Sequence, residues 1–225
     1  MPNFDIVKNN EVEKTFRVAH VISDFDVKPE HSNEHFKGVI KIPDKWNIGV
    51  IVGNSGTGKT TIAKELFGDV LTTSFNYNSK SVIDDMTENC SVDEITKMFY
   101  AVGFGSVPCW LKPYKVLSNG EKMRVDLARA LLEKNIICFD EFTSVIDRDV
   151  AKTACIAVHK AVKRQNKKFV AVSCHKDILE WLEPDWIFDT NTMQGFFGQS
   201  LDQYLNFKLE NVIGATGKNL DVIII

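Results

Sequence analysis

The features that mark membrane, secreted and disulfide-stabilised proteins are missing from this sequence. Its longest apolar stretches, such as residues 136–139 and 222–225, are far shorter than the ~20 residues that a membrane-spanning helix needs. Residues 1–17 mix Asp, Lys, Asn and Glu and lack the apolar core of a signal peptide. The five cysteines are widely spaced without a CxxC pair, which disfavours a disulfide framework or a zinc site. We therefore expect a cytoplasmic protein that does not insert into a membrane.

An excess of positive charge is also missing. The chain carries 27 Lys plus Arg against 30 Asp plus Glu, a formal net charge of −3. The composition therefore does not indicate nucleic-acid binding, although a local basic patch stays open. No internal repeat, low-complexity tract or Pro/Gly-rich linker divides the 225 residues, so we expect a single domain.

The strongest feature that is present is a glycine-rich segment between an apolar strand and a helix. Residues 53–60 read GNSGTGKT and match the phosphate-loop pattern GxxxxGK[ST]. The β-branched run 48–52 suits a buried parallel strand, and residues 61–67 predict a helix. The backbone N–H groups of such a loop and the helix N-terminus point at phosphate. We predict that a nucleoside triphosphate is bound by Gly53, Asn54, Ser55, Gly56, Thr57, Gly58, Lys59, Thr60 and Thr61.

Four residues give this predicted site its chemistry. Lys59 would reach the β- and γ-phosphates, and the Thr60 hydroxyl would bind Mg²⁺. Asp140 and Glu141 follow the apolar run 136–139, and ligands gather at the carboxyl ends of parallel strands. We expect Asp140 to hold Mg²⁺ and Glu141 to polarise the attacking water.

A second helix start lies upstream of these acids. Residues 117–121 read LSNGE, and the sequence here resembles the ATP-binding-cassette (ABC) ATPases, whose LSGGQ-like signature loop opens such a helix. Asn119 stands at the first glycine of that pattern and Glu121 at the glutamine. The Ser118 hydroxyl, the Gly120 backbone and the helix dipole suit a γ-phosphate, and Ser118 with Glu121 also fits a capping box.

Two further motifs follow in the order of this family. Residues 144–147 resemble the D-loop, so the resemblance assigns Asp147 to the nucleotide site. His175 follows the apolar run 169–172 and occupies the position of the switch histidine, whose role is a contact to the γ-phosphate. The four motifs span residues 53–175.

The text around the motifs, from Gly38 to Thr190, resembles a narrower subgroup of solitary cassette ATPases. These occur in bacteria and their phages, and some are fused to a predicted acetyltransferase domain. The shared text includes Trp110 before the signature and the string WLEPDW at 181–186. This resemblance implies an ABC ATPase without a permease.

The resemblance also implies an architecture. The fold class is α/β, a P-loop NTPase of ABC ATPase type, with a mostly parallel central sheet, flanking helices and N-terminal antiparallel β strands. We expect one domain over residues 1–225, with a nucleotide-binding core at about 1–74 and 117–225. The 59 residues from Lys59 to Ser118 are few for this family, so a reduced helical subdomain is expected at about 75–116.

The sequence departs from the family just after the P-loop helix. Transport cassettes dock onto membrane helices through the helical subdomain and a Q-loop, but residues 75–80 contain no Gln. Asn76 or Asn78 is a candidate replacement that contacts Mg²⁺ or water. The aromatic residue that stacks on adenine has no clear equivalent, and its candidates are Phe25, His31 and Phe36.

In the family's mechanism each P-loop meets the signature loop of an opposite subunit. We therefore expect a head-to-tail homodimer that binds two ATP–Mg²⁺ between protomers and opens on hydrolysis. Its expected role is that of a soluble ATPase acting on nucleic acid or on a protein partner, such as an acetyltransferase supplied in trans. The alternative is the nucleotide-binding subunit of a transporter with a separately encoded permease. A P-loop kinase is disfavoured because the signature and switch-histidine motifs have no use in a kinase.

Two remaining patterns are less specific. The basic residues of 160–168 predict either a solvated helix face or a phosphate-contacting patch, and they are Lys160, Lys163, Arg164, Lys167 and Lys168. The tail from Gly195 alternates apolar and polar residues before the apolar end 222–225, which predicts a closing strand or, if that end is exposed, a partner-docking edge.

Overall fold

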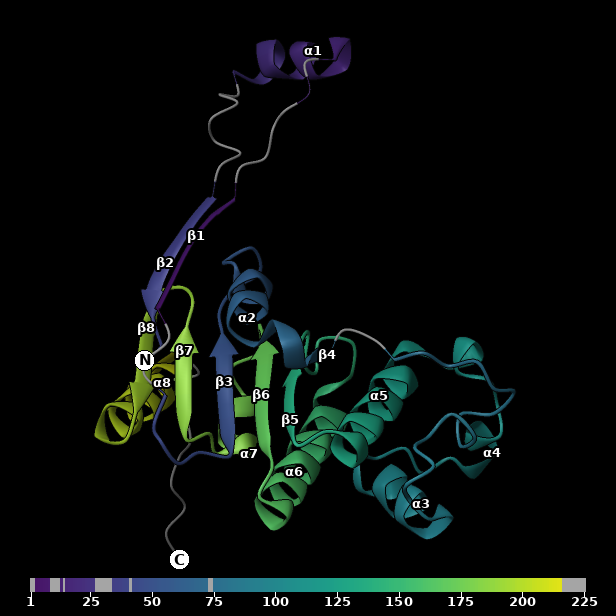
Figure 1. Ribbon diagram of the computed structural model, residues 1–225. Coiled ribbons are helices and arrows are strands. Elements are labelled where there is room, and N and C mark those ends of the chain that lie inside the picture. Colours follow the sequence, from purple (N-terminus) through teal and green to yellow (C-terminus); the bar gives the residue numbers. More distant parts are fainter. Residues whose placement is uncertain are drawn as a thin grey trace, which may run out of the picture.

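The computed structural model describes residues 3–8, 13, 15–26, 34–40, 42–72 and 75–215, with side chains up to residue 207. Its centre is a six-stranded sheet in the order β4-β5-β6-β3-β7-β8 (Figure 1). All neighbouring strands are parallel except β8, which runs antiparallel to β7. The strands are β3 (Ile48–Val52), β4 (Leu71–Thr72), β5 (Ile136–Phe139), β6 (Lys168–Ser173), β7 (Trp186–Asp189) and β8 (Gln194–Phe197).

Both faces of this sheet are covered, which is why its central strands are apolar throughout. Every residue of β3 is buried, and alternate side chains enter opposite layers of the core. Val50 lies in the same layer as the helices α5 (Asn119–Glu133) and α6 (Arg148–Gln165). Ile51 lies in the other layer with α2 (Lys59–Phe67). Because the strands from β4 to β7 run in the same direction, their carboxyl ends lie at one open edge of the sheet.

The N-terminal residues form an arm beside this core. β1 (Asn3–Lys8) and β2 (Glu34–Val39) pair as a two-stranded antiparallel sheet, as the sequence predicts for the N-terminal strands. Between them lies α1 (Phe16–Phe25), which stands apart from the rest of the protein (Figure 1). This helix is not predicted from the sequence. The Thr15 hydroxyl caps its start by accepting from the backbone N–H of Val18.

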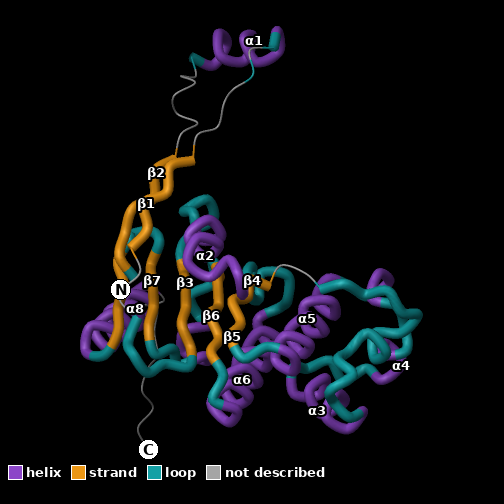
Figure 2. The backbone as a smooth tube through the Cα atoms, viewed as in Figure 1, coloured by secondary structure: helices purple, strands orange, loops and turns teal. Residues whose placement is uncertain are grey.

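The region between β4 and α5 contains only short helices. These are α3 (Val92–Ala101), α4 (Val107–Trp110) and the 3₁₀ turn η3 (Tyr114–Val116), joined by long loops (Figure 2). We call residues 75–116 the lobe. Its small size agrees with the reduced helical subdomain, while the exact domain boundaries stay a prediction. Within the described ranges, no helix is both long and apolar enough to cross a bilayer.

The C-terminal part differs from the predicted closing strand. β8 does close the sheet, but it ends at Phe197, and Gly198 then takes a left-handed conformation (φ 54°). The chain continues as α8 (Gln199–Ala215), which buries Leu201 and Tyr204 against the core. The prediction of a strand beyond Phe197 is therefore wrong, because alternation over a few residues does not outweigh a helix that buries two side chains. Residues 222–225 lie outside the described part. The remaining elements are α7 (Ile178–Leu182) and the 3₁₀ turn η2 (Gly68–Val70).

Candidate nucleotide site

The phosphate loop joins β3 to α2 at the open edge of the sheet, and two of its glycines are required by the geometry. Gly58 has φ 83°, a left-handed conformation, and a Cβ there would lie 2.4 Å from the ring of Phe36. At Gly53 a Cβ would lie 2.1 Å from the Thr190 hydroxyl oxygen. A larger side chain at Gly58 or Gly53 would therefore push the loop away from Phe36 or Thr190 and change its curved shape.

Lys59 and Thr60 begin α2. Lys59 is buried, and its Nζ donates to the backbone oxygen of Asn54, 2.7 Å away across the loop. The Thr60 Oγ1 donates to Asp140 Oδ1 at 3.2 Å, which places the end of β5 beside the phosphate loop. A hydroxyl and a carboxylate side by side form the hard-oxygen donor set that Mg²⁺ prefers, so the residues present fit this ion. Ser55 is exposed beside them, and Thr61 is partly buried on the first turn.

The loop after β5 holds Glu141 in an uncommon conformation. Its φ is 51°, in the left-handed region that non-glycine residues rarely adopt. The backbone N–H of Glu141 donates to Asp140 Oδ1 (2.9 Å), and its carbonyl accepts from the Ser144 hydroxyl (2.8 Å). The next residue, Phe142, is buried and donates its N–H to Val172 of β6 (2.8 Å). These hydrogen bonds fix the backbone at Glu141, whose side chain is exposed.

His175 lies on the loop after β6, between the strands that carry the phosphate loop and the acids. Its backbone N–H donates to Ser173 Oγ at 3.1 Å. Burial, with a smaller contribution from Arg148, lowers the pKa of the His175 imidazole below its usual value. The ring is therefore neutral at neutral pH. The structure brings the phosphate loop, Asp140, Glu141 and His175 to one edge of the sheet, as expected, while their chemical roles stay predictions.

The signature residues lie elsewhere on the same chain. Ser118 caps α5 in a full capping box, because its Oγ accepts from Glu121 N (3.3 Å) and its N–H donates to Glu121 Oε2 (2.8 Å). Asn119 borders an open hollow of about 360 Å³ together with Asp140 and Glu141. Among the described residues, no hydrogen bond or ion pair joins residues 118–121 to the phosphate loop. Within one chain the signature loop therefore borders the hollow beside the two acids but makes no hydrogen bond to the described phosphate loop.

The D-loop residue Asp147 begins α6, where its carboxylate accepts from Val150 N at 2.9 Å. It is exposed and close in sequence to Arg148, a residue that the sequence reasoning overlooked. The Arg148 guanidinium pairs through two nitrogens with Asp177, two residues after His175, and lies 5.4 Å above the Trp181 ring. This pairing ties the D-loop to the segment that carries the switch histidine.

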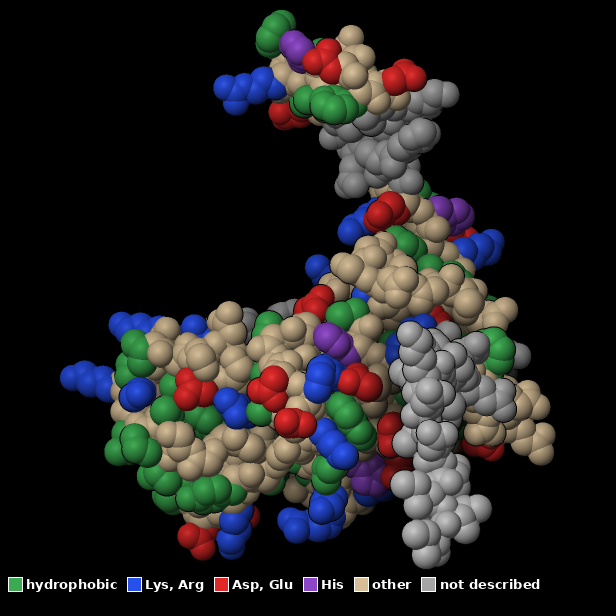
Figure 3. Space-filling model, turned by 180° about the vertical axis from the view of Figure 1, so that it is seen from behind, with side chains coloured by type: hydrophobic (Ala, Val, Ile, Leu, Met, Phe, Trp, Pro, Cys, Tyr) green, Lys and Arg blue, Asp and Glu red, His purple; other side chains and the backbone are tan. Residues whose placement is uncertain are grey.

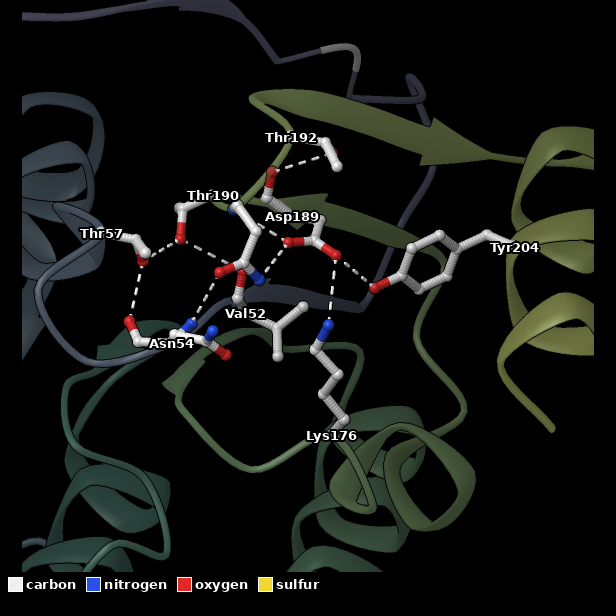
Figure 4. Close-up of polar contacts among 9 residues, drawn as sticks. Val52, Asn54, Thr57, Lys176, Asp189, Thr190, Thr192 and Tyr204 are labelled. Atoms are coloured by element: carbon white, nitrogen blue, oxygen red, sulfur yellow. Dashed lines mark hydrogen bonds and ion pairs between the residues drawn. The ribbon is translucent and has the colours of Figure 1, made fainter. Parts of the chain in front are cut away.

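A buried polar network behind the phosphate loop was also missed (Figure 4). Asp189, at the end of β7, accepts from Tyr204 Oη (2.7 Å), Lys176 Nζ (3.4 Å) and both the backbone and side-chain nitrogens of Asn191 (2.9 and 2.8 Å). Burial alone would raise the pKa of Asp189, but these donors outweigh it and hold the pKa below its usual value. Asp189 is therefore an ionised buried hub.

This hub reaches the phosphate loop through its neighbours. The side-chain oxygen of Asn191 accepts from the backbone N–H of Asn54 at 3.1 Å. The hydroxyls of Thr190 and Thr57 share a hydrogen bond at 2.5 Å (Figure 4). The signal that could have found these residues is their position, because they directly follow a fully buried strand at the ligand edge of the sheet.

The structure describes both asparagines that are proposed as replacements for the missing Gln. In the described part of the chain, no hydrogen bond joins the side chain of Asn76 or Asn78 to Asp140 or Glu141. Asn76 uses its backbone oxygen to accept from Arg129 Nη1 (2.8 Å). The segment is instead fixed to α5, so the predicted substitution finds no support in the geometry.

A pair of stacked tyrosines makes that attachment. The rings of Tyr77 and Tyr114 lie parallel with centroids 3.9 Å apart, and both hydroxyls donate to Asp126 of α5 (2.8 and 2.6 Å). Burial raises the pKa of the Asp126 carboxyl, although the two hydroxyls act against that change. Burial and the nearby carboxylate also raise the pKa of both tyrosines, so their hydroxyls stay protonated.

The structure shows whether the basic residues of 160–168 form one phosphate-contacting patch. Lys167 is buried and donates to the backbone oxygen of Leu131, and the Lys168 ammonium lies 5.0 Å over the Trp46 ring. The five cations therefore do not form one continuous phosphate-binding face. Of the adenine candidates, Phe36 is buried against Gly58, Phe25 lies on α1, and His31 lies outside the described residues.

Comparison with known proteins adds independent support. No family model matches the chain. It is 29% identical over 181 residues to the energy-coupling factor transporter ATP-binding protein EcfA1 of Staphylococcus aureus strain USA300, and equally so to that of strain NCTC 8325. Each match covers 63% of this chain and 66% of the relative, slightly under two thirds of the relative's length.

Solved structures show the same architecture at low identity. The dimeric bacterial ABC transporter cassette MJ0796 superimposes with a TM-score of 0.55 and 16% identity, covering 69% of this chain and 87% of that one. A bacterial Atm1-family ABC exporter with ATP bound gives a TM-score of 0.57 and 19% identity, covering 75% of this chain and 36% of that one. The expected fold class is confirmed, and the curated relatives support the expected ATP hydrolase. The chain has the P-loop NTPase fold of the ATP-binding-cassette ATPases.

Proposed function

We propose that this chain hydrolyses ATP as the nucleotide-binding subunit of a transporter-type assembly whose membrane part is encoded separately. The observation that carries the ATPase chemistry is the contact of Thr60 with Asp140 next to the buried Lys59, which joins the phosphate loop to the acidic strand end. The curated relatives are named as transporter ATP-binding proteins, which favours this role over that of a solitary ATPase acting on nucleic acid.

The residues at the sheet edge divide the reaction among them. Lys59 and the loop amides hold the β- and γ-phosphates, while Thr60 and Asp140 hold Mg²⁺. The ion, when bound, offsets phosphate charge. Glu141, whose backbone is left-handed and whose side chain is exposed, orients the attacking water. The neutral His175 ring contacts the γ-phosphate without adding a positive charge of its own.

The lack of a hydrogen bond between the signature residues and the described phosphate loop motivates a dimer. A second copy, turned head to tail, would place its Ser118 and Gly120 opposite the phosphate loop, and two-fold symmetry would build two equal sites. The dimeric state named for the cassette MJ0796 supports this arrangement. ATP binds the closed state more tightly than the open one and thereby shifts the equilibrium, and hydrolysis removes that preference.

The test uses Glu141→Gln, which keeps the site's shape but removes the base. With ATP and Mg²⁺, light scattering is expected to show a dimer that is absent with ADP and absent in Glu141→Gln/Lys59→Ala. A Glu141→Gln protein that stays monomeric with ATP and Mg²⁺ would contradict the proposed dimer. Retained wild-type turnover in Glu141→Gln would contradict the assigned base.

A second candidate is a solitary ATPase that acts on a protein partner, for example an acetyltransferase-like protein. The specific observation in its favour is the Gln-free segment 75–80, which the Tyr77–Asp126 contact ties to α5. Affinity capture of the Glu141→Gln dimer from detergent-solubilised membranes separates the two roles. Recovery of an integral membrane protein supports the transporter role, whereas recovery of a soluble protein, or turnover stimulated by DNA, supports the solitary one.

A further inference from the structure

The helix α1 presents an apolar stripe that no described part of the chain buries. No residue of α1 is buried, and the exposed fractions of Val21 and Phe25 are 51% and 74%. With Val18 and Ile22, these residues recur at positions i, i+3, i+4 and i+7, which places them on one face of the helix. Phe16, 85% exposed, lies on the opposite face beside His20. A stripe of this kind in water indicates a packing partner.

The arm that carries α1 stands at the edge of the sheet where nucleotide is expected. Phe36 of β2 packs against Gly58 at the end of the phosphate loop, and β1 contacts α2. From this base the arm extends beyond the carboxyl ends of the strands, away from the sheet (Figure 1). In a head-to-tail dimer, the molecule met on that side is the signature half of the second copy.

The signature half offers a matching surface. Next to the signature loop, the exposed fractions of Val107, Leu111 and Val116 are 45%, 68% and 58%, and Lys112 and Lys115 between them are exposed. We call these five residues the lobe surface. Hydrophobic side chains are visible both on the end of the arm and over the lobe in Figure 3.

The charges of the two surfaces are opposite in sign. Around the α1 stripe, the described residues carry three acids, Glu13, Asp24 and Asp26, of which Asp24 pairs with His20 (2.7 Å), against the cation Arg17. The lobe surface carries the two cations Lys112 and Lys115. Apolar stripes flanked by opposite charges favour each other over a second stripe of the same kind.

We propose that α1 of each protomer packs its apolar stripe on the lobe surface of a second copy of this chain, so that two arms clasp the closed dimer. The inference rests on the proposed head-to-tail dimer. Because the dimer is symmetric, the contact forms twice, so a substitution that weakens it reduces the binding free energy of the dimer at two places.

The test is the dimer dissociation constant of Glu141→Gln protein in ATP and Mg²⁺, measured by sedimentation velocity. Phe25→Ser on the stripe is expected to raise it about 100-fold, since each of two equivalent sites loses an apolar anchor. Leu111→Ser on the lobe surface should act similarly. The dissociation constant of the Phe25→Ser/Leu111→Ser double variant should rise by less than the two single effects combined, because both substitutions remove the same contact. The matched control Phe16→Ser, on the other face of α1, should change the constant less than about 3-fold.

The possible results separate the two proposals. A Glu141→Gln parent that stays monomeric overturns the proposed dimer and this inference with it. A parent that dimerises, with Phe25→Ser dimerising equally well or Phe16→Ser weakening it as much, overturns the clasp and leaves the dimer standing. If the Phe25→Ser protein melts at a clearly lower temperature but dimerises as well as the parent, α1 packs on its own chain, and the inference is also overturned.

Discussion

The two halves of the nucleotide site are held in place by different means. The phosphate loop is supported from behind by the buried Asp189, through Asn191 and the Thr190–Thr57 contact, so strand β7 fixes its shape. The signature loop lies at the surface, where its capping box and a hydrogen bond from Arg124 to the Gly120 carbonyl hold it, and the Tyr77–Tyr114 stack on Asp126 supports the helix behind it. The first support lies in the core behind β7, and the second lies between α5 and the lobe.

The two supporting carboxylates, Asp189 and Asp126, also differ in pKa. Asp189 has several donors, including the ammonium of Lys176, and its pKa lies below the usual value. Asp126 has two neutral hydroxyl donors, and burial leaves its pKa above the usual value. The phosphate-loop support therefore favours an ionised carboxylate, whereas the signature-side support does not.

The largest expected effect comes from the phosphate-loop half. Lys59→Ala removes the cation that meets the phosphates, and ATP turnover should fall by about 1,000-fold, as for the loss of other groups that stabilise developing charge. Steady-state phosphate release measures this. The control Lys64→Ala, an exposed lysine on the same helix, should keep its turnover. Equal losses in both variants would mean that the effect is not specific to the site.

A second prediction tests whether the halves belong to different chains. Ser118→Glu places a repelling carboxylate at the signature loop and should also abolish turnover. When the inactive Lys59→Ala and Ser118→Glu proteins are mixed in equal amounts, about a quarter of wild-type turnover should return, since half of the dimers then hold one intact site. No recovery on mixing would indicate that each chain uses its own signature loop.

The third prediction compares the supports by stability. Asp189→Ala leaves Tyr204 and Lys176 without their buried acceptor and should lower the free energy of unfolding by about 2–4 kcal/mol. Urea unfolding measures this, together with weaker binding of a fluorescent ATP analogue. Asp202→Asn, exposed on α8, is the matched control and should unfold like wild type. Unchanged nucleotide affinity in Asp189→Ala would show that the network does not shape the phosphate loop.

On the signature side the expected loss is smaller. Tyr77→Phe and Tyr114→Phe each remove one hydrogen bond to Asp126 while keeping the stacked rings, and each should cost about 1 kcal/mol. The pair should be non-additive, because the second change leaves the buried carboxyl without a hydroxyl donor. Tyr100→Phe, at an exposed ring, serves as the control. An additive pair would indicate that water replaces the lost donors.

The smallest expected effect is the opposite pH dependence of the two carboxylates. As the pH falls toward about 4, the usual pKa of Asp, the unfolded chain takes up a proton before Asp189 does, so the Asp189 contribution to stability declines. Asp126 takes up its proton earlier in the folded state, so its contribution rises. Between pH 6 and pH 4, the free energy of unfolding measured in urea should fall less steeply in Asp189→Asn than in wild type, and more steeply in Asp126→Asn. Parallel slopes would contradict this assignment.

Local patterns were sufficient to predict the elements that carry the site. The run 48–52 followed by GNSGTGKT predicts strand, loop and helix, and the structure has β3, the loop and α2 there. The same reasoning missed α1, although the spacing of Val18, Val21, Ile22 and Phe25 was the available signal. It also expected a strand beyond Phe197, where α8 begins. Both errors concern segments whose conformation depends on what they pack against.

The sequence by itself determined the order of the motifs and the residues at each strand end, because these follow from local periodicity and from the need to bury apolar runs, while the mostly parallel sheet was implied by the family resemblance. Only the tertiary structure decided which side chains meet. Asp189 supports the phosphate loop and Tyr77 holds the lobe to α5 because strands and helices distant in sequence lie side by side. Such contacts are made across 137 positions for Asn54 and Asn191, a distance over which no local pattern carries information.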